Sequence, residues 1–334
     1  MAVTRRLKRS VSFRVGLVLV ALLVAFAVLG PVVAPRDPFT SDFARAVSPD
    51  EMPVGPTRDF WLGADLIYRD QFARLALGAR YSLVIGVVAT LLATSLGALV
   101  GVVAGYYEGA RGVRVGRATV VALAAAFVAW IYVGNAPAIA LAAVAIASTL
   151  PPIAKRAERL GGVELDADGV LMRAVDVLLA FPFLLLVMAI GAAFERTSPA
   201  TILFVLGVTG WLGTARVVRA KVMQIRHLEF VTAARSLGQS TPRILLRHVL
   251  PNISGPLVVI ATVSVAQMIL AESVLSYLGA GMEPPTPTWG HMLFEGQDAY
   301  TGAPWLLWAP AALILASVLG FNLLGEGLRD ALDA

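Results

Sequence analysis

Long apolar runs with few charges dominate the sequence. A helix needs about 20 mostly apolar residues to cross a bilayer, because its backbone polar groups must be satisfied within the segment. Eight stretches approach this requirement and predict an all-α, polytopic membrane protein. The predicted spans are residues 15–33, 82–104, 118–134, 138–153, 175–194, 201–218, 253–279 and 305–324. The third and fourth are separated only by a short Asn-Ala-Pro turn, so together they predict a tight hairpin.

This pattern divides the chain into three parts. Residues 1–80 hold an N-terminal tail, a first apolar helix that we interpret as a signal anchor, and a polar outer segment. Residues 81–326 form the transmembrane domain, with the hairpin inserted at about 110–168 and a long polar loop at 216–251. Residues 327–334 form a short tail.

Composition supports a membrane protein. Hydrophobic residues make up 58% of the chain and charged residues 15%, against about 45–50% and about 25% in soluble domains. Because there is no cysteine, disulfide scaffolds and thiolate metal sites are excluded. The net charge of +5 could indicate nucleic-acid binding, but most basic residues lie in alternate loops, as the positive-inside rule requires. Both termini are therefore predicted to be cytoplasmic, with no nucleic-acid partner.

The outer segment, residues 35–80, carries charges of both signs. We interpret them as a solvated or interfacial face rather than a site, with a plain connector as the equal alternative. The residues concerned are Asp65, Arg69, Asp70, Arg74 and Arg80.

The polar loop at 216–251 predicts two short helices around a glycine. Apolar positions recur at three- and four-residue steps from Met223 to Leu237, as in an amphipathic helix. Gly238 suits the position after a helix, and Thr241-Pro242 suits the start of a second one, closed by Leu250-Pro251. Such a loop could be a compact knob for a protein partner or a helix lying on anionic lipid.

The run from Glu229 to Gly238, followed after eleven residues by Leu250-Pro251-Asn252, resembles the Ala-Ala, Gly, Leu-Pro signature of permease subunits of binding-protein-dependent ABC importers. Further motifs resemble the dipeptide, oligopeptide and nickel branch, and its C-type subunit in particular. They include Leu62-Gly-Ala-Asp65, Gly78-Ala-Arg80-Tyr-Ser82, Ala180-Phe-Pro182, Pro284 to Gly290 and Phe321 to Asp330.

The resemblance implies a type I importer fold whose polar loop docks into an ATPase subunit. It also implies a second, homologous permease subunit, two ATPase subunits, an extracytoplasmic substrate-binding protein and a prokaryotic plasma (inner) membrane. The residues expected to couple to the ATPase are Glu229, Thr232, Ala233, Ala234, Gly238, Arg243, Leu250 and Pro251. The chain departs from its relatives at Thr232, where they often have glutamate, and in the inserted hairpin.

No chemistry of catalysis is evident in the sequence. The phosphate-binding loop of ATPases needs a lysine after glycine, and the chain's lysines, Lys8, Lys155 and Lys221, do not follow one. We therefore expect no catalytic residues, metal or cofactor in this chain, with ATP and Mg²⁺ bound by the partner subunits.

Polar and breaking residues within the spans are candidates for the translocation path. An ionisable group at mid-membrane costs about 2.5–3.5 kcal/mol, which singles out Glu272. Because it lies near the outer end of its span, we expect it to reach water or a partner, or to line the path with Gln267. Pro182 is expected to kink its helix. Gly97, Gly101 and Gly105 share a helix face and are expected to pack within this chain.

The outer loop, residues 282–304, is predicted to be constrained and exposed. By resemblance its Pro285, Pro287 and Trp289 face the binding protein. Di- or oligopeptides are the expected cargo, with nickel or another small solute as the alternative. The competing class is an ATP-independent secondary transporter.

Overall fold

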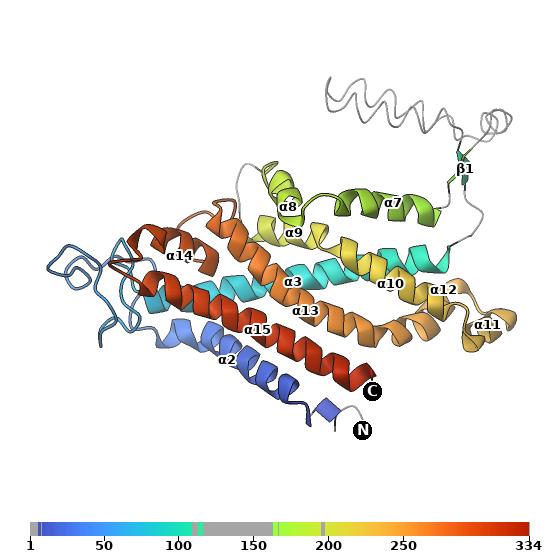
Figure 1. Ribbon diagram of the computed structural model, residues 1–334, viewed down its shortest axis with the longest axis horizontal. Helices are drawn as coiled ribbons and strands as arrows, with labels where there is room; N and C mark the ends of the chain where they lie inside the picture. The colour runs from blue at the N-terminus through green and yellow to red at the C-terminus, as the bar shows by residue number, and fades with distance from the viewer. Residues whose placement is uncertain are drawn as a thin grey trace, which may run out of the picture. The chain divides into compact units, whose positions relative to one another are not determined.

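The computed structural model describes residues 6, 7, 9–108, 113–115, 163–165, 167–194 and 198–333. The chain divides into two units: unit 1 is Met1–Gly101 with Leu179–Ala334, and unit 2 is Val102–Leu178. Helices make up most of the described residues in each (Figure 1), apart from one pair of three-residue strands. The predicted all-α class is therefore confirmed.

Unit 1 is built on long apolar helices. They are α2 (Val11–Val33), α3 (Gln71–Tyr106, which enters unit 2 after Gly101), α9 (Pro199–Thr209), α10 (Trp211–Ile225), α13 (Leu250–Tyr277) and α15 (Trp305–Asp333). Shorter elements connect them: α8 (Phe183–Gly191), α11 (Glu229–Ser236), α12 (Thr241–Ile244), the π-helical turn η1 (Leu245–Val249), α14 (Trp289–Gly296) and the 3₁₀ turn η2 (Gln297–Ala299).

Five helical stretches among the described residues are long and apolar enough to cross a membrane, with α9 and α10 counted as one (Pro199–Ile225). The number is six if α7 (Ala167–Leu179) and α8 count as one broken span. They match six of the eight predicted spans. Between α7 and α8 the chain leaves the helical conformation, and Pro182 is the N-cap of α8. Pro182 therefore breaks the predicted helix rather than kinking it. The spans predicted at 118–134 and 138–153 lie outside the described residues, so eight spans remain a prediction.

Local sequence explains where several helices begin. The Ser10 hydroxyl accepts a hydrogen bond from the Phe13 amide at the start of α2, and Ser198 caps α9 ahead of Pro199. At α14, the Thr288 hydroxyl accepts from the His291 amide at 3.2 Å. Each cap satisfies an amide that has no partner within its helix.

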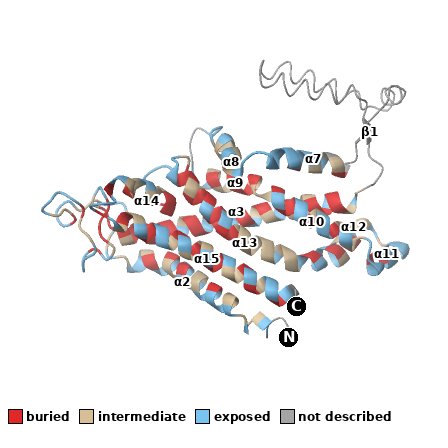
Figure 2. Cartoon of the chain, in the orientation of Figure 1, coloured by how far each residue is buried: buried red, intermediate tan, exposed pale blue. Residues whose placement is uncertain are grey.

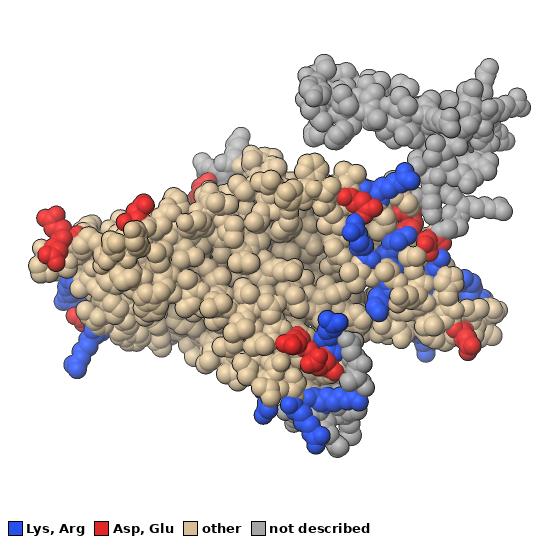
Figure 3. All heavy atoms as spheres, viewed as in Figure 1, with Lys and Arg blue, Asp and Glu red and all other residues tan. Residues whose placement is uncertain are grey.

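Two clusters of buried apolar side chains hold unit 1 together. One joins α2, α3, α13, α14 and α15 around Trp289, and the other joins α3, α8, α9 and α13 around Met268 and Leu206. In Figure 2, buried residues accordingly follow the inner sides of α3 and α13, whereas much of α2 is intermediate or exposed. On the face drawn in Figure 3, the middle of unit 1 is largely free of charged side chains, which suits contact with lipid.

Glycines allow the helices of unit 1 to approach closely. A Cβ added to Gly97 would lie 2.6 Å from the Thr214 Cβ, and one added to Gly101 would lie 2.6 Å from the Ala215 carbonyl oxygen. Since Thr214 and Ala215 belong to α10, both glycines pack within this chain, as expected. The beginning of α2 and the end of α15 also meet, because a Cβ on Gly327 would lie 2.5 Å from that of Phe13.

The outer segment between α2 and α3 is folded. Ala46, Phe60 and Ala64 form a small buried cluster, and the indole nitrogen of Trp305 donates to the Ala64 carbonyl at 3.0 Å. These contacts fix the segment to the beginning of α15. The interpretation of this segment as a plain connector is therefore wrong.

Unit 2 contains the ends of the predicted insertion. Strands β1 (Val113–Val115) and β2 (Val163–Leu165) pair antiparallel, with Val113 opposite Leu165 and Val115 opposite Val163. The residues that directly flank 116–162 in the sequence are therefore paired with each other. α7 follows β2 directly.

Candidate functional site

The polar loop begins with a turn that the sequence pattern did not predict. α10 ends at Ile225, and Leu228 has an extended backbone (φ −69°, ψ 149°) as the N-cap of α11. The helix predicted from Met223 to Leu237 is therefore wrong in its extent. The apolar repeat continues across the turn even though the helix does not. Ile225 is the last residue of α10, and Leu228 is the N-cap of α11.

Gly238 has the backbone conformation that its place after a helix predicts. Its φ is +75°, which L-residues with a Cβ rarely adopt. Its amide donates to the Arg235 carbonyl at 3.0 Å, and that of Gln239 donates to Ala234 at 3.2 Å, closing the end of α11. A Cβ at Gly238 would meet no atom within 4 Å, so glycine is required here by backbone conformation rather than by space.

The loop has a small interior of its own. Its buried side chains come from three elements: Val231 and Ala234 on α11, Ile244 on α12 and Val249 in η1. α11 contacts both α12 and η1. The His248 ring nitrogen lies 3.2 Å from the Gln239 side-chain oxygen. This interior fixes α11 against α12, so we call residues 228–250 the coupling knob.

Most of the predicted coupling residues are exposed on the knob or directly after it. The exposed ones are Glu229, Thr232, Ala233, Gly238, Arg243, Leu250 and Pro251. Ala234 is the exception, because its side chain is buried within the knob. The expectation that both alanines face a partner is therefore wrong, and only Ala233 is available.

Exposed leucines are the feature of the knob that sequence reasoning missed. Leu237 is 80% exposed and Leu246 is 68% exposed, with Phe230 at 42%. The sequence pattern included Leu237 in the apolar repeat of an amphipathic helix, but it lies past the last turn of α11 as its C-cap. Leucines this open to solvent suit a surface that is covered by another protein.

Leu250-Pro251 does not close a helix, contrary to expectation. Residues 241–277 form one continuous apolar helical stretch, with the π-helical turn η1 directly before Leu250. The Pro251 ring would clash with the carbonyl four residues earlier in a regular α-helix, and the wider π turn relieves that crowding. The knob is therefore continuous with α13.

Thr232 makes a local contact within the knob. Its hydroxyl donates to the Leu228 carbonyl at 3.3 Å. Glu229 is exposed one turn earlier. A threonine cannot form the ion pair that a glutamate at this position could form.

Glu272 lies inside unit 1 rather than at water. Its side chain is 0% exposed. The Ser82 hydroxyl donates to one carboxyl oxygen at 3.0 Å, and the Ser276 hydroxyl donates to the other at 2.8 Å. The expected access to water is wrong, and the carboxyl joins α3 to α13. Gln267 is exposed, so the structure does not bring these two residues to one surface.

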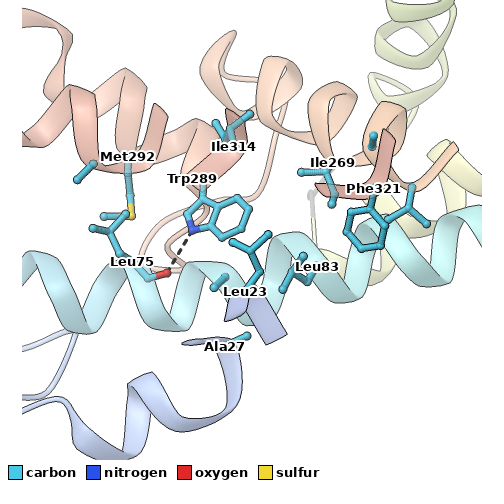
Figure 4. Close-up of a cluster of buried hydrophobic side chains, with 13 residues drawn as sticks. Leu23, Ala27, Leu75, Leu83, Ile269, Trp289, Met292, Ile314 and Phe321 are labelled. Carbon is cyan, nitrogen blue, oxygen red and sulfur yellow. Dashed lines mark hydrogen bonds between the residues drawn. The ribbon is translucent and has the colours of Figure 1, made fainter. Parts of the chain in front are cut away.

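Trp289 is likewise a core residue and not part of an exposed loop. It is 0% exposed, and its indole nitrogen donates to the Leu75 carbonyl at 3.2 Å (Figure 4). Pro287 is also buried, whereas Pro285 is exposed. Of the three residues expected to face a binding protein, Pro285 alone is on the surface.

The alternating charges before and within α3 form an ion-pair cluster in which Asp65, Arg69 and Arg74 are buried and Glu295 is partly buried. Arg69 Nε lies 2.6 Å from Asp65 Oδ2, and its Nη2 lies 3.1 Å from Glu295 Oε1. Arg74, which is 1% exposed, lies 3.3 Å from Asp65 through Nε and donates through Nη2 to Glu295 Oε2. We call Asp65, Arg69, Arg74 and Glu295 the outer cluster. The predicted solvated face is therefore wrong for this set, although Arg80 is exposed.

The pKa values of Glu295 and of nearby Asp70 are shifted in opposite directions. Burial tends to raise the pKa of Glu295, but the hydrogen bond from His291 and the charges of Arg74 and Arg69 together lower it to about 2. Burial raises the pKa of Asp70, which caps α3 by accepting from the Ala73 amide at 2.8 Å. Glu295 therefore stays ionised at any physiological pH.

Among the cavities of unit 1, two lie close to the residues described above. One of about 240 Å³ borders the outer cluster and is lined by Asp65, Ile67, Arg69, Met292 and Glu295 among others. The other, of about 230 Å³, is apolar and lies between α8, α9 and the end of α13. Among the described residues, no three His, Cys, Asp or Glu side chains could hold a metal ion.

Comparison with known proteins agrees with this architecture. Residues 166–334 match the family model described as "binding-protein-dependent transport system inner membrane component". Residues 2–51 match the "N-terminal TM domain of oligopeptide transport permease C".

Curated relatives extend the similarity over almost the whole chain. The oligopeptide transport system permease protein OppC of Bacillus subtilis is 33% identical over 96% of this chain and 84% of its own length. The dipeptide permease protein DppC of the same organism is 33% identical, over 98% and 83%. The glutathione permease protein GsiD of Pectobacterium atrosepticum is 31% identical, over 98% and 88%. This chain is therefore a multi-pass membrane permease subunit and belongs to the family of binding-protein-dependent ABC importer permeases.

Proposed function

We propose that this permease subunit imports di- or oligopeptides, and that ATP hydrolysis by partner subunits drives it through the coupling knob. It pairs with a homologous permease chain, two ATPase subunits that bind ATP and Mg²⁺, and an extracytoplasmic binding protein. Both termini and the knob lie in the cytoplasm of a prokaryotic cell. This chain contributes no catalytic residue.

The coupling knob is the observation that carries this proposal. Movement of an ATPase can tilt membrane helices only if a rigid element transmits it. The knob has a buried interior, exposed apolar side chains at Leu237 and Leu246, and a direct helical connection to α13. Those features favour a protein partner over anionic lipid, because large apolar side chains this exposed suit a surface that another protein covers.

Peptide cargo is supported by relatives that carry the words oligopeptide and dipeptide in their names. Glutathione is the alternative that a relative's name favours, and nickel is the alternative that the sequence motifs indicated. Because the chain belongs to the family of binding-protein-dependent ABC importer permeases, we no longer propose an ATP-independent secondary transporter.

Copurification tests the partners. The tagged chain is extracted from its native membrane in mild detergent, and its companions are identified by mass spectrometry. We expect one copy of a second permease and two ATPase subunits for each copy of this chain. Recovery of the chain alone, under conditions that preserve a known ABC complex, would contradict the proposal.

Uptake tests the cargo. Cells that carry the chain and cells that lack it are given a radiolabelled dipeptide, a tetrapeptide, glutathione or nickel. We expect ATP-dependent uptake of the peptides to require the chain. Uptake of glutathione or nickel alone would leave the permease assignment intact and reassign its cargo.

A further inference from the structure

The outer cluster joins segments that are distant in sequence. Glu295 on α14 receives a guanidinium on each carboxyl oxygen: Arg69 Nη2 on Oε1 and Arg74 Nη2 on Oε2. Arg74 lies on the first turns of α3, 221 positions earlier in the chain. Because each oxygen is held by a separate guanidinium, α14 cannot rotate about its axis without breaking an ion pair.

A second set of contacts fixes α14 to the same part of α3. Trp289 donates to the Leu75 carbonyl, and a Cβ on Gly78 would lie 3.3 Å from Trp289 Cδ1. On its other side, a Cβ on Gly290 would lie only 2.1 Å from the Ser273 carbonyl oxygen of α13. These contacts leave α14 no room to move separately from α3.

The outward side of this assembly is open to a partner. Phe294 on α14 is 43% exposed, and Tyr300, shortly after η2, is 63% exposed. Asp298 in η2 is exposed as well. A protein that docks on the outer end of unit 1 would therefore press on the element that Glu295 holds.

The same α3 reaches the helix that leads into the coupling knob. Gly97 and Gly101 pack against Thr214, Ala215 and Val218 of α10 with no space for a side chain. α10 then continues through a turn of three residues into α11. One helix thus has close contacts both at the outer cluster and at the entrance to the knob.

We propose that Arg74 and Glu295 are positioning residues that couple docking of the extracytoplasmic partner at α14, along α3 and α10, to the coupling knob. The inference rests on the proposed function, since it assumes an ATPase at the knob and a binding protein outside. The physical basis of this coupling is that rigid elements in continuous contact can carry a coupling energy between distant sites.

The test uses the complete complex, reconstituted in lipid nanodiscs with its ATPases. ATP hydrolysis is measured with and without saturating binding protein, and the ratio of the two rates is compared between variants. Coupling energies between protein sites typically correspond to changes of about fivefold or more. For Glu295→Gln, which keeps the shape and removes the charge, we expect this ratio to fall about fivefold.

Asp50→Asn is the matched control, because it removes one exposed acidic charge from the outer segment without touching the cluster or α14. Its ratio is expected to remain at the native value. Arg74→Gln and the double variant with Glu295→Gln complete a cycle, in which the two effects should not add if both act through one ion pair. A merely structural role would lower the thermal midpoint and leave the ratio unchanged.

A native ratio in Glu295→Gln, with binding protein still docked, overturns the inference. If that variant unfolds below the assay temperature, Arg74→Lys is measured by the same criterion, because lysine keeps the charge but cannot reach Asp65 and Glu295 together. Failure of the native chain to recover an ATPase would instead reject the proposed function. The two failures are therefore distinguishable.

Discussion

At the scale of single residues, backbone conformation decides what Gly238 can be replaced by. Its φ of +75° is accessible to glycine and, less readily, to asparagine, while the space around it is empty. A substitution here therefore changes the direction in which the chain leaves α11 rather than creating a clash. The knob would keep its helices but present its exposed leucines differently.

For Gly238→Val we expect a cost of about 1–2 kcal/mol or more, since a left-handed conformation penalises a residue with a Cβ, and a β-branched one most. The amount of ATPase that copurifies should be highest for the native chain, lower for Gly238→Asn and lowest for Gly238→Val. Gly213→Ala is the control, because Gly213 lies within helix α10, is exposed and has no atom within 4 Å of an added Cβ. Equal ATPase recovery from Gly238→Val and the native chain would contradict this prediction.

Glu295 makes a second residue-scale prediction, on pH. Its pKa is lowered from 4.5 to about 2, so the stability it contributes is fully present above about pH 4.5 and is lost as the pH falls towards 2. The raised pKa of Asp70 acts in the opposite sense, since protonation of that group favours the folded state.

The thermal midpoint of the detergent-solubilised chain is therefore expected to drop more steeply between about pH 4.5 and 2 in the native protein than in Glu295→Gln. Asp70→Asn should steepen the drop, because it removes the opposing contribution while keeping a capping side chain. Identical pH profiles for the native chain and Glu295→Gln would show that the carboxyl is not held as the geometry indicates.

At the scale of elements, glycine faces set the contact between α3 and α10. An added Cβ at Gly101 would lie 2.6 Å from a backbone oxygen and 2.7 Å from the Val218 Cβ. Backbone cannot move aside as a flexible side chain can, so the helices themselves must separate. The same argument applies to Gly97, one turn earlier on the same face of α3.

Gly101→Ala is expected to destabilise unit 1 by about 1–3 kcal/mol, the usual cost of overpacking a well-filled contact. Thermal unfolding in detergent, followed by tryptophan fluorescence, measures the effect. Gly191→Ala is a suitable comparison, since an added Cβ there meets nothing within 4 Å. A Gly101→Ala midpoint no lower than that of Gly191→Ala would refute the close contact.

Sequence pattern predicted these helices well where the signal is local. Apolar length identified α2, α3, α13 and α15, and glycine chemistry identified the end of α11. The pattern failed where the deciding partner is distant in sequence. Arg74 could not be recognised as buried without Glu295, which is 221 positions away, and Trp289 in a Pro-rich loop gave no sign of its bond to Leu75.

A second kind of failure concerns interruptions of a helix. The apolar repeat from Ile225 to Val231 is compatible with one continuous helix, yet Leu228 has an extended backbone. Conversely, Leu250-Pro251 has the local signature of a helix end, but the π turn before it accommodates the proline. In both places the backbone conformation differs from the one that the local sequence favours.

At the scale of the whole molecule, the inserted segment is attached through a narrow base. β1 and β2 pair antiparallel, with Val115 opposite Val163 as the innermost pair. Two residues are enough to connect paired strands, and Asn-Gly is the sequence that best suits such a turn. Residues 116–162 can therefore be replaced by Asn-Gly without altering either end of the attachment.

We expect this shortened variant to insert, to recover the ATPase and to keep its C-terminus in the cytoplasm. The reason is that the sequence predicts two crossings within the removed segment, and removing an even number leaves every later span in its original orientation. A green fluorescent protein fused after the last residue should stay fluorescent, and an alkaline phosphatase fused there should stay inactive. The opposite pair of results would mean that an odd number of crossings was removed, and the predicted topology of eight spans would then be wrong.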